Sequence, residues 1–256
     1  MNLKYIFGAF ICLPLLPILY FDGKKIRKNI PILPEAKEPF GVANAEFKKK
    51  LNIICVGEST IAGVGADYHK NAFSGSLANE LSLQLNASIS WKVYAKSGYT
   101  VKRISEKIIP KIEEKTADLI VIGIGGNEAF TLNSPKKFKK QIILLIDELQ
   151  EKFPNTPILF TNMPPIKGFT AFTKTIKFVV GNLVEILGSA LEKTVKNDST
   201  VFYNSEIITL KNWKKRNNLQ GSISDFFSDG VHPSQLAYQV WGKEMASFIV
   251  SNHILK

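Results

Sequence analysis

The feature that most constrains this chain is a regular alternation, from residue 51 onward, of short apolar runs with longer segments of helical periodicity. The short runs, rich in residues that favour strands, lie at 51–56, 89–94, 119–123, 158–162 and 200–203. The helical segments lie at 74–85, 101–114, 135–152, 173–195 and 235–249. This alternation predicts an α/β fold built on a doubly wound parallel sheet of about five strands.

The composition fits one folded domain and argues against a metal centre. The chain has 256 residues, 45% of them hydrophobic, which is enough to bury a core without disulfides or metal. It contains only two cysteines and three histidines, too few for a zinc finger, a cysteine-rich secreted scaffold or an iron–sulfur site. We therefore expect no metal and no organic cofactor.

The N-terminus carries an apolar segment, because residues 5–21 form a run of 17 without a charge. As a helix at about 1.5 Å per residue the run reaches roughly 25 Å, slightly less than the ~30 Å hydrocarbon core of a bilayer. A spanning helix, an interfacial helix and a signal peptide all stay open. Cleavage is the least favoured, since residues 19–23 lack the small-residue pattern of a cleavage site.

Basic residues follow the apolar segment and outnumber those before it. Lys4 and the amino terminus stand on one side of it, and four basic residues stand on the other: Lys24, Lys25, Arg27 and Lys28. The positive-inside rule therefore predicts a cytoplasmic domain, with export as the alternative. The expected division is an apolar anchor or uncleaved signal-like segment at 1–22, a basic, proline-containing linker at 23–50 and the folded domain at 51–256.

The whole chain is basic, with 33 Lys and Arg against 22 Asp and Glu and a formal charge of +11. Such a charge favours anionic partners. The basic runs are scattered between the predicted elements and do not gather on one helix, so a membrane surface is favoured over nucleic acid. The sequence makes no prediction of oligomeric state.

The segment after the first predicted strand, residues 56–65, reads Val-Gly-Glu-Ser-Thr-Ile-Ala-Gly-Val-Gly. It is not a phosphate-binding loop, because Ala66 stands where the motif requires lysine. It is not a dinucleotide fingerprint, because Tyr68 replaces the third glycine. It is not a Gly-x-Ser-x-Gly elbow either, because Ile61 occupies the last position.

Four short blocks, in this order, resemble the SGNH or GDSL-type hydrolase family. They are Gly57-Glu58-Ser59, Gly98, Gly125-Gly126-Asn127-Glu128 and Asp229-Gly230-Val231-His232. The resemblance covers about residues 52–249 and implies a three-layer, flavodoxin-like fold with esterase or lipase activity. Glu58 and Glu128 replace the aspartates usual in the family, and both replacements keep the charge.

The residue types in these blocks suit acyl transfer. Serine needs a nearby base to act as a nucleophile, so we expect Ser59 to be the nucleophile and His232 the base. Asp229 would orient the imidazole and stabilise its charged form. The resemblance implies an oxyanion hole formed by the backbone N–H groups of Ser59 and Gly98 and the side-chain amide of Asn127.

Residues outside the blocks suggest a substrate pocket. Met163, Phe169 and Phe172 follow the fourth predicted strand and are weaker candidates for an acyl pocket. His69 lies in a polar stretch and is expected to be exposed.

The predicted activity is hydrolysis of an acyl or acetyl ester, and a lipid ester is one candidate substrate. An acyltransferase and a non-catalytic, membrane-associated binding protein on the same fold are the alternatives.

Overall fold

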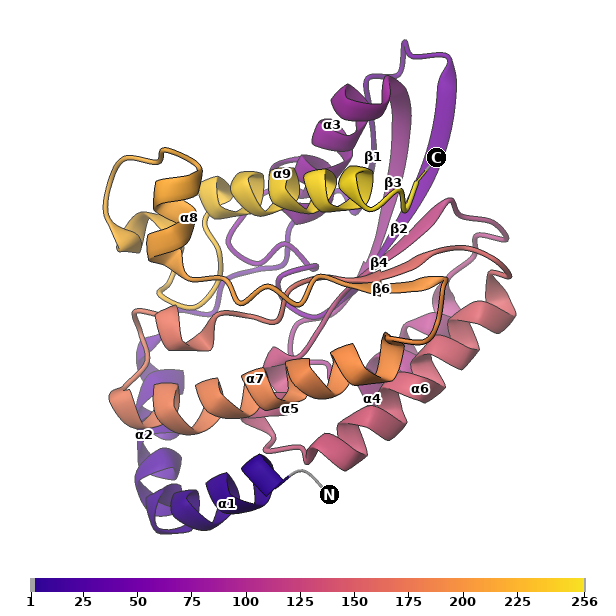
Figure 1. Ribbon diagram of the computed structural model, residues 1–256. Helices are drawn as coiled ribbons and strands as arrows, with labels where there is room; N and C mark the ends of the chain where they lie inside the picture. The colour runs from indigo at the N-terminus through magenta and orange to yellow at the C-terminus, as the bar shows by residue number, and fades with distance from the viewer. Residues whose placement is uncertain (1–2, 256) are drawn as a thin grey trace.

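The computed structural model describes residues 3–255 and has an α/β architecture. A six-stranded sheet of order β1-β3-β2-β4-β5-β6 lies between two layers of helices (Figure 1). The strands are β1 (Phe40–Ala43), β2 (Lys49–Gly57), β3 (Ala87–Ala95), β4 (Leu119–Gly123), β5 (Ile158–Phe160) and β6 (Val201–Tyr203). β2 to β6 are parallel, and each lies at one of the five predicted runs. The sequence therefore predicts the sheet correctly, apart from one edge.

The helices divide between the two faces of the sheet. One face carries α3 (Phe73–Leu85) and α9 (Gln235–Ser251), and the other carries α4 (Val101–Lys107), α6 (Pro135–Lys152) and α7 (Lys174–Val195). Two short helices, α5 (Gly126–Phe130) and α8 (Leu210–Arg216), follow β4 and β6.

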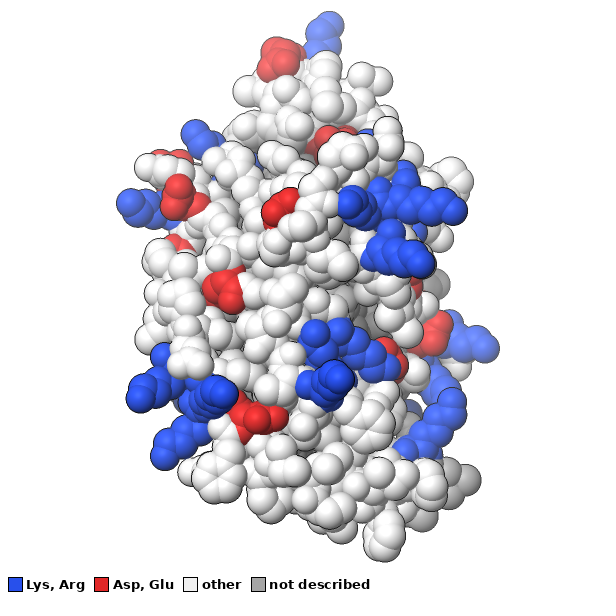
Figure 2. Space-filling view, turned by 90° about the vertical axis from the view of Figure 1, so that its left-hand side faces the viewer, with Lys and Arg blue, Asp and Glu red and all other residues white. Residues whose placement is uncertain are grey.

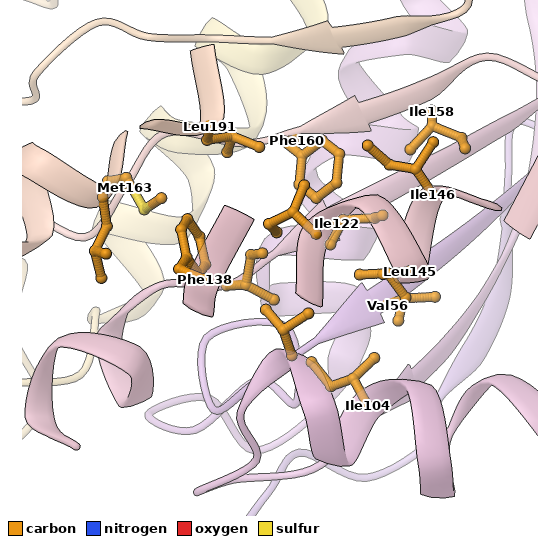
Figure 3. Packing of buried hydrophobic residues seen from close by; sticks show 14 of the residues in the cluster. Val56, Ile104, Ile122, Phe138, Leu145, Ile146, Ile158, Phe160, Met163 and Leu191 are labelled. Atoms are coloured by element: carbon orange, nitrogen blue, oxygen red, sulfur yellow. The ribbon is translucent and has the colours of Figure 1, made fainter. Parts of the chain in front are cut away.

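Both faces of the sheet are buried, which explains the uninterrupted apolar strands. Along β2, Val56 points to the cluster under α4, α6 and α7, whereas Cys55 points to the cluster under α3 and α9. Figure 3 shows the first cluster, in which Val56 lies among side chains such as Phe138 of α6 and Phe160 of β5. Burying each such large side chain stabilises the fold by about 1.5–3 kcal/mol.

The helix predicted at 101–114 is shorter than expected. α4 ends at Lys107, and the chain continues as a 3-10 turn over Ile109–Lys111. Pro110 lacks a backbone N–H and cannot continue an α-helical hydrogen-bond ladder, which accounts for the change.

The segment expected to be a linker, residues 23–50, contains regular structure. β1 pairs antiparallel with β3 and adds a sixth strand at the sheet edge, and β2 already begins at Lys49. Between α2 and β1, the Glu35 carboxylate accepts a hydrogen bond from the Ser97 N–H at 2.8 Å. The second half of this segment is therefore attached to the domain.

The apolar N-terminal segment forms two helices, α1 (Leu3–Cys12) and α2 (Leu16–Asn29), joined by a 3-10 turn over Leu13–Leu15. They run in different directions, and both contact α7 (Figure 1). The Thr173 hydroxyl donates a 2.5 Å hydrogen bond to the Asp22 carboxylate. Of the residues described, only the stretch Lys4–Asn29 is helical, long and apolar enough to cross a membrane.

His69 is not exposed as predicted, because only 3% of its surface is accessible. Its backbone N–H donates to the Lys37 carbonyl at 2.9 Å, and its ring lies 6.3 Å from that of Trp91. The segment before β1 thus folds over the imidazole, a long-range contact that the local polarity around His69 does not reveal.

Candidate active site

Three of the four motif blocks lie at the carboxyl ends of neighbouring parallel strands, where α/β sheets place their sites. Ser59 follows β2, Gly98 follows β3, and Asn127 lies in α5 after β4. The fourth block, with His232, lies in the loop before α9.

Hydrogen bonds hold the loop before α9 against the turn that contains Ser59. The Ser228 hydroxyl donates to the Gly65 carbonyl at 3.0 Å, and the hydroxyl of Tyr238, near the start of α9 itself, donates to the Val64 carbonyl at 2.8 Å. The candidate base and the candidate nucleophile therefore lie on segments that contact each other directly.

Asp229 and His232 form a hydrogen-bonded pair. The imidazole Nδ1 lies 2.7 Å from Oδ2 of Asp229, while Oδ1 accepts the N–H groups of Val231 at 2.9 Å and His232 at 2.7 Å. Burial acts to raise the pKa of Asp229, but the hydrogen bonds from His232 and Val231 outweigh it, and the pKa lies below its ordinary value. An ionised Asp229 at Nδ1 leaves Nε2 of the ring as the atom that can accept a proton.

Gly230 gives this loop its shape. Its φ of +85° is in the left-handed region, and a Cβ at this position would lie 2.9 Å from the Ala171 Cβ. The Ala171 N–H donates to the Gly230 carbonyl at 3.2 Å, so the loop after β5 supports the loop that carries His232.

Ser59 lies in a tight turn, in which its carbonyl accepts the Val64 N–H at 3.0 Å. Within residues 3–255 its backbone N–H donates to no other group, and its hydroxyl makes no hydrogen bond to His232. Hydrogen bonds between nucleophile and base often tighten only once substrate binds.

The candidate oxyanion donors of Gly98 and Asn127 differ in whether they already make hydrogen bonds within the protein. The N–H of Gly98, at a φ of +79°, makes no hydrogen bond within the described chain. The Asn127 amide, in contrast, donates both of its hydrogens, to Glu58 at 2.6 Å and to the Tyr99 carbonyl at 3.0 Å. To bind an oxyanion, Asn127 would have to exchange one of these partners.

Two buried carboxyls connect the loops of the site: Glu58 links two of the blocks, and Glu128 links α5 to the start of α4. No sequence pattern predicts either role. Glu58 accepts the N–H of Gly126 at 2.8 Å and of Asn127 at 3.0 Å, while Glu128 accepts the N–H of Val101 at 2.5 Å. Burial, with added repulsion from Glu128, raises the pKa of Glu58 to about 8, although the N–H donors of Asn127 and Gly126 act in the opposite direction. Burial likewise raises the pKa of Glu128. The only hint in the sequence is that both positions hold glutamate, one methylene longer than the aspartate usual in the family.

The three candidate pocket residues are all buried beside the blocks. Phe169 and Phe172 contact each other, with ring centroids 5.3 Å apart, and Phe172 also packs edge-on against Phe130 at the end of α5. Met163 and Phe169 line a cavity of about 60 Å³ that Glu58 also lines. Phe172 therefore supports the wall, whereas Met163 and Phe169 reach the cavity itself.

Across the described part of the chain, no three His, Cys, Asp or Glu side chains are grouped so that they could hold a metal ion.

The chain has known relatives by family and by fold. Comparison with curated protein sequences gives no match. Among solved structures, a Clostridium thermocellum family 3 carbohydrate esterase is similar, with a TM-score of 0.57 and 18% identity over 80% of this chain and 97% of that one. A lipase from a goat rumen metagenome has a TM-score of 0.53 and 19% identity, covering 77% and 96% of the two chains. Phospholipase A1 from Streptomyces albidoflavus has a TM-score of 0.50 and 15% identity, covering 77% and 98%.

At these identities the solved structures establish the fold alone. The family is established by sequence, because the model of the GDSL-like lipase/acylhydrolase family matches residues 55–240 and so covers most of the chain. The chain belongs to the GDSL-like lipase/acylhydrolase family, whose members hydrolyse esters.

Proposed function

We propose that the chain is a serine ester hydrolase with Ser59 as nucleophile, His232 as general base and Asp229 as the group that orients the base. The observation that carries the proposal is the 2.7 Å contact between Asp229 and Nδ1 of His232, on a loop bonded to the turn that contains Ser59. This pairing leaves Nε2 as the proton acceptor, as the reaction requires.

In the proposed reaction, Oγ of Ser59 attacks the ester carbonyl carbon and its proton passes to Nε2 of His232. The N–H groups of Ser59 and Gly98 donate to the oxyanion, and Asn127 joins them once it releases Glu58 or Tyr99. Collapse of the tetrahedral intermediate breaks the ester C–O bond, and the leaving alkoxide takes the proton from His232. A water molecule, deprotonated by His232, then attacks the acyl-Ser59 ester, which releases the carboxylic acid and restores Ser59.

A fluorophosphonate probe tests this proposal, because it labels a serine only when that serine is activated. We expect the wild type to be labelled and Ser59→Ala not to be. Ser247→Ala, at an exposed serine of α9, is the matched control and should label normally. An unlabelled wild type would favour the binding-protein alternative, and an acylated alcohol in place of free acid would favour the acyltransferase.

We also propose that α1 and α2 attach the enzyme to a membrane. Their outer faces expose large apolar side chains, including Phe7 at 70% and Phe10 at 75%. On the face seen in Figure 2, the lowest part of the molecule, where α1 lies in Figure 1, shows no red or blue atoms, and above it lie mostly blue atoms with some red. Within α1 only Lys4 is charged. An apolar end bordered by cations suits an anionic lipid surface.

Vesicle flotation tests the attachment. Phe7→Glu combined with Phe10→Glu should reduce binding of the full-length protein to vesicles of phosphatidylcholine and phosphatidylglycerol about tenfold or more. Phe40→Glu, at an equally exposed phenylalanine on β1, should bind like the wild type. Equal binding by all three proteins would contradict the role of these helices. Loss of wild-type binding at high salt would indicate basic patches instead of apolar insertion.

A further inference from the structure

A groove of about 610 Å³ lies beside the catalytic loops, between α7, the loop after β5 and the segment after β6. We infer that it binds the acyl chain of the ester substrate, an inference that rests on the proposed function. Its walls include Pro164, Val184, Ile208 and Leu210, and its volume is within the ~300–1,000 Å³ typical of small-molecule sites.

The groove is continuous with the site through shared walls. The cavity of about 60 Å³ next to Glu58, Thr60 and Pro233 has five lining residues in common with the groove. These residues are Met163, Pro164, Pro165, Ile208 and Leu210. Thr60 adjoins the nucleophile and Pro233 adjoins the base, so the small cavity lies next to the reacting groups and the groove lies behind it.

Met163 stands between the two spaces. A Cβ at Gly125, two residues before Asn127, would collide with the Met163 sulfur, and a Cβ at Gly188 of α7 would lie 3.2 Å from its Cγ. The two glycines thus make room for one unbranched, flexible side chain. A change of the Met163 rotamer would let a chain pass from the cavity into the groove.

The outer end of the groove also suits an alkyl chain. Ile207 and Ile223 are exposed at 59% and 45% and give it apolar edges. The lining also holds charged side chains: Lys167, which crosses Gly181, pairs with Glu185 at 2.7 Å, and Lys177, Glu192, Glu206 and Lys211 line the groove as well. An acyl chain would lie against the apolar walls and not against these charges.

The test compares kcat/KM for p-nitrophenyl octanoate and p-nitrophenyl acetate, each below its micelle-forming concentration. Ser189→Trp places an indole in the groove and should lower the octanoate-to-acetate ratio about tenfold, or ~1.4 kcal/mol. Met163→Ala widens the passage and should raise the same ratio. Lys193→Trp, one turn further along α7 and outside the groove, is the matched control and should leave the ratio unchanged.

A binding measurement separates this inference from the proposed chemistry. In a Ser59→Ala background, a fluorescent long-chain fatty acid should bind, and the added Ser189→Trp change should weaken its binding about tenfold. Fatty acid binding by a wild type that hydrolyses no ester would refute the hydrolase proposal and keep the groove as a fatty acid site. Ratios within twofold of the wild type for both Ser189→Trp and Met163→Ala, or no fatty acid binding, would overturn the inference.

Discussion

The side-chain carboxyl group of Glu58 holds Asn127 through two hydrogen bonds, from the backbone N–H at 3.0 Å and from the side-chain amide at 2.6 Å. Glu58 directly precedes the candidate nucleophile, and Asn127 is a candidate oxyanion donor. The pair therefore fixes two parts of the site relative to each other. It also makes Asn127 a structural residue as well as a candidate for chemistry.

Asn127→Ala should consequently have two effects. Loss of a transition-state donor should lower kcat/KM about a hundredfold or more. Loss of a donor to buried Glu58 should lower the free energy of unfolding by about 1–3 kcal/mol. Ester kinetics and urea unfolding measure the two effects, with Asn252→Ala at the exposed end of α9 as control. Reduced stability with unchanged turnover would assign Asn127 a purely structural role.

The rate losses caused by Ser59→Ala and His232→Ala should not be additive, because in the proposed mechanism the two residues take part in the same proton-transfer step. Each single alanine variant should remove nearly all turnover of a soluble ester, and the double variant should be scarcely slower than either. Asp229→Ala should be milder, since nucleophile and base both stay in place. If the logarithms of the Ser59 and His232 rate losses simply add, the two residues do not share a step.

Glu58 should make the protein less stable as the pH rises. Burial raises the pKa of Glu58 from 4.5 to about 8, so between these values the folded protein keeps a proton that the unfolded chain has released. The free energy of unfolding therefore falls as the pH increases through this window. Glu58→Gln does not titrate and should flatten this slope in urea unfolding between about pH 6.5 and 8. An exposed control, Glu106→Gln, should keep the wild-type slope.

His69 should have the opposite effect at lower pH. Burial lowers the pKa of its imidazole from 6.5 to about 4, so below pH 6.5 the unfolded chain takes up a proton that the folded protein refuses. Stability is fully present above pH 6.5 and falls towards pH 4, by up to about 3 kcal/mol.

Thermal or urea unfolding across this window should show a smaller loss for His69→Gln than for the wild type. His253→Gln, at the exposed C-terminal end, is the matched control. An equal acid sensitivity of the wild type and His69→Gln would show that other groups cause it.

Helices and strands could be predicted from local sequence where the residues that determine them lie within one short segment. The helix predicted at 135–152 has the observed bounds, because Ser134 accepts the Lys137 N–H and Pro135 occupies the first turn. The parallel strands were equally predictable, since burial on both faces leaves continuous apolar runs.

What could not be predicted depends on partners far away in the sequence. β1 (Phe-Gly-Val-Ala) is an apolar edge strand of only four residues, too short to be predicted as a strand by itself, and it is recognisable only from its pairing with β3. The burial of His69 depends on residues more than thirty positions earlier, and the contacts of Glu58 on residues almost seventy positions later. The approach of Ser59 to His232 was inferred from family resemblance, because no local pattern specifies it.

The packing of α1 and α2 on α7 has a consequence for biosynthesis. Asp22 is synthesised 151 residues before Thr173, its hydrogen-bond partner, and α7 follows directly after Thr173. While the intervening chain is translated, the inner apolar faces of the N-terminal helices have no protein surface to cover them. Those faces stay uncovered by protein until α7 has been made, so the N-terminal helices can dock onto the domain only after the chain of β1 to β5 has been synthesised.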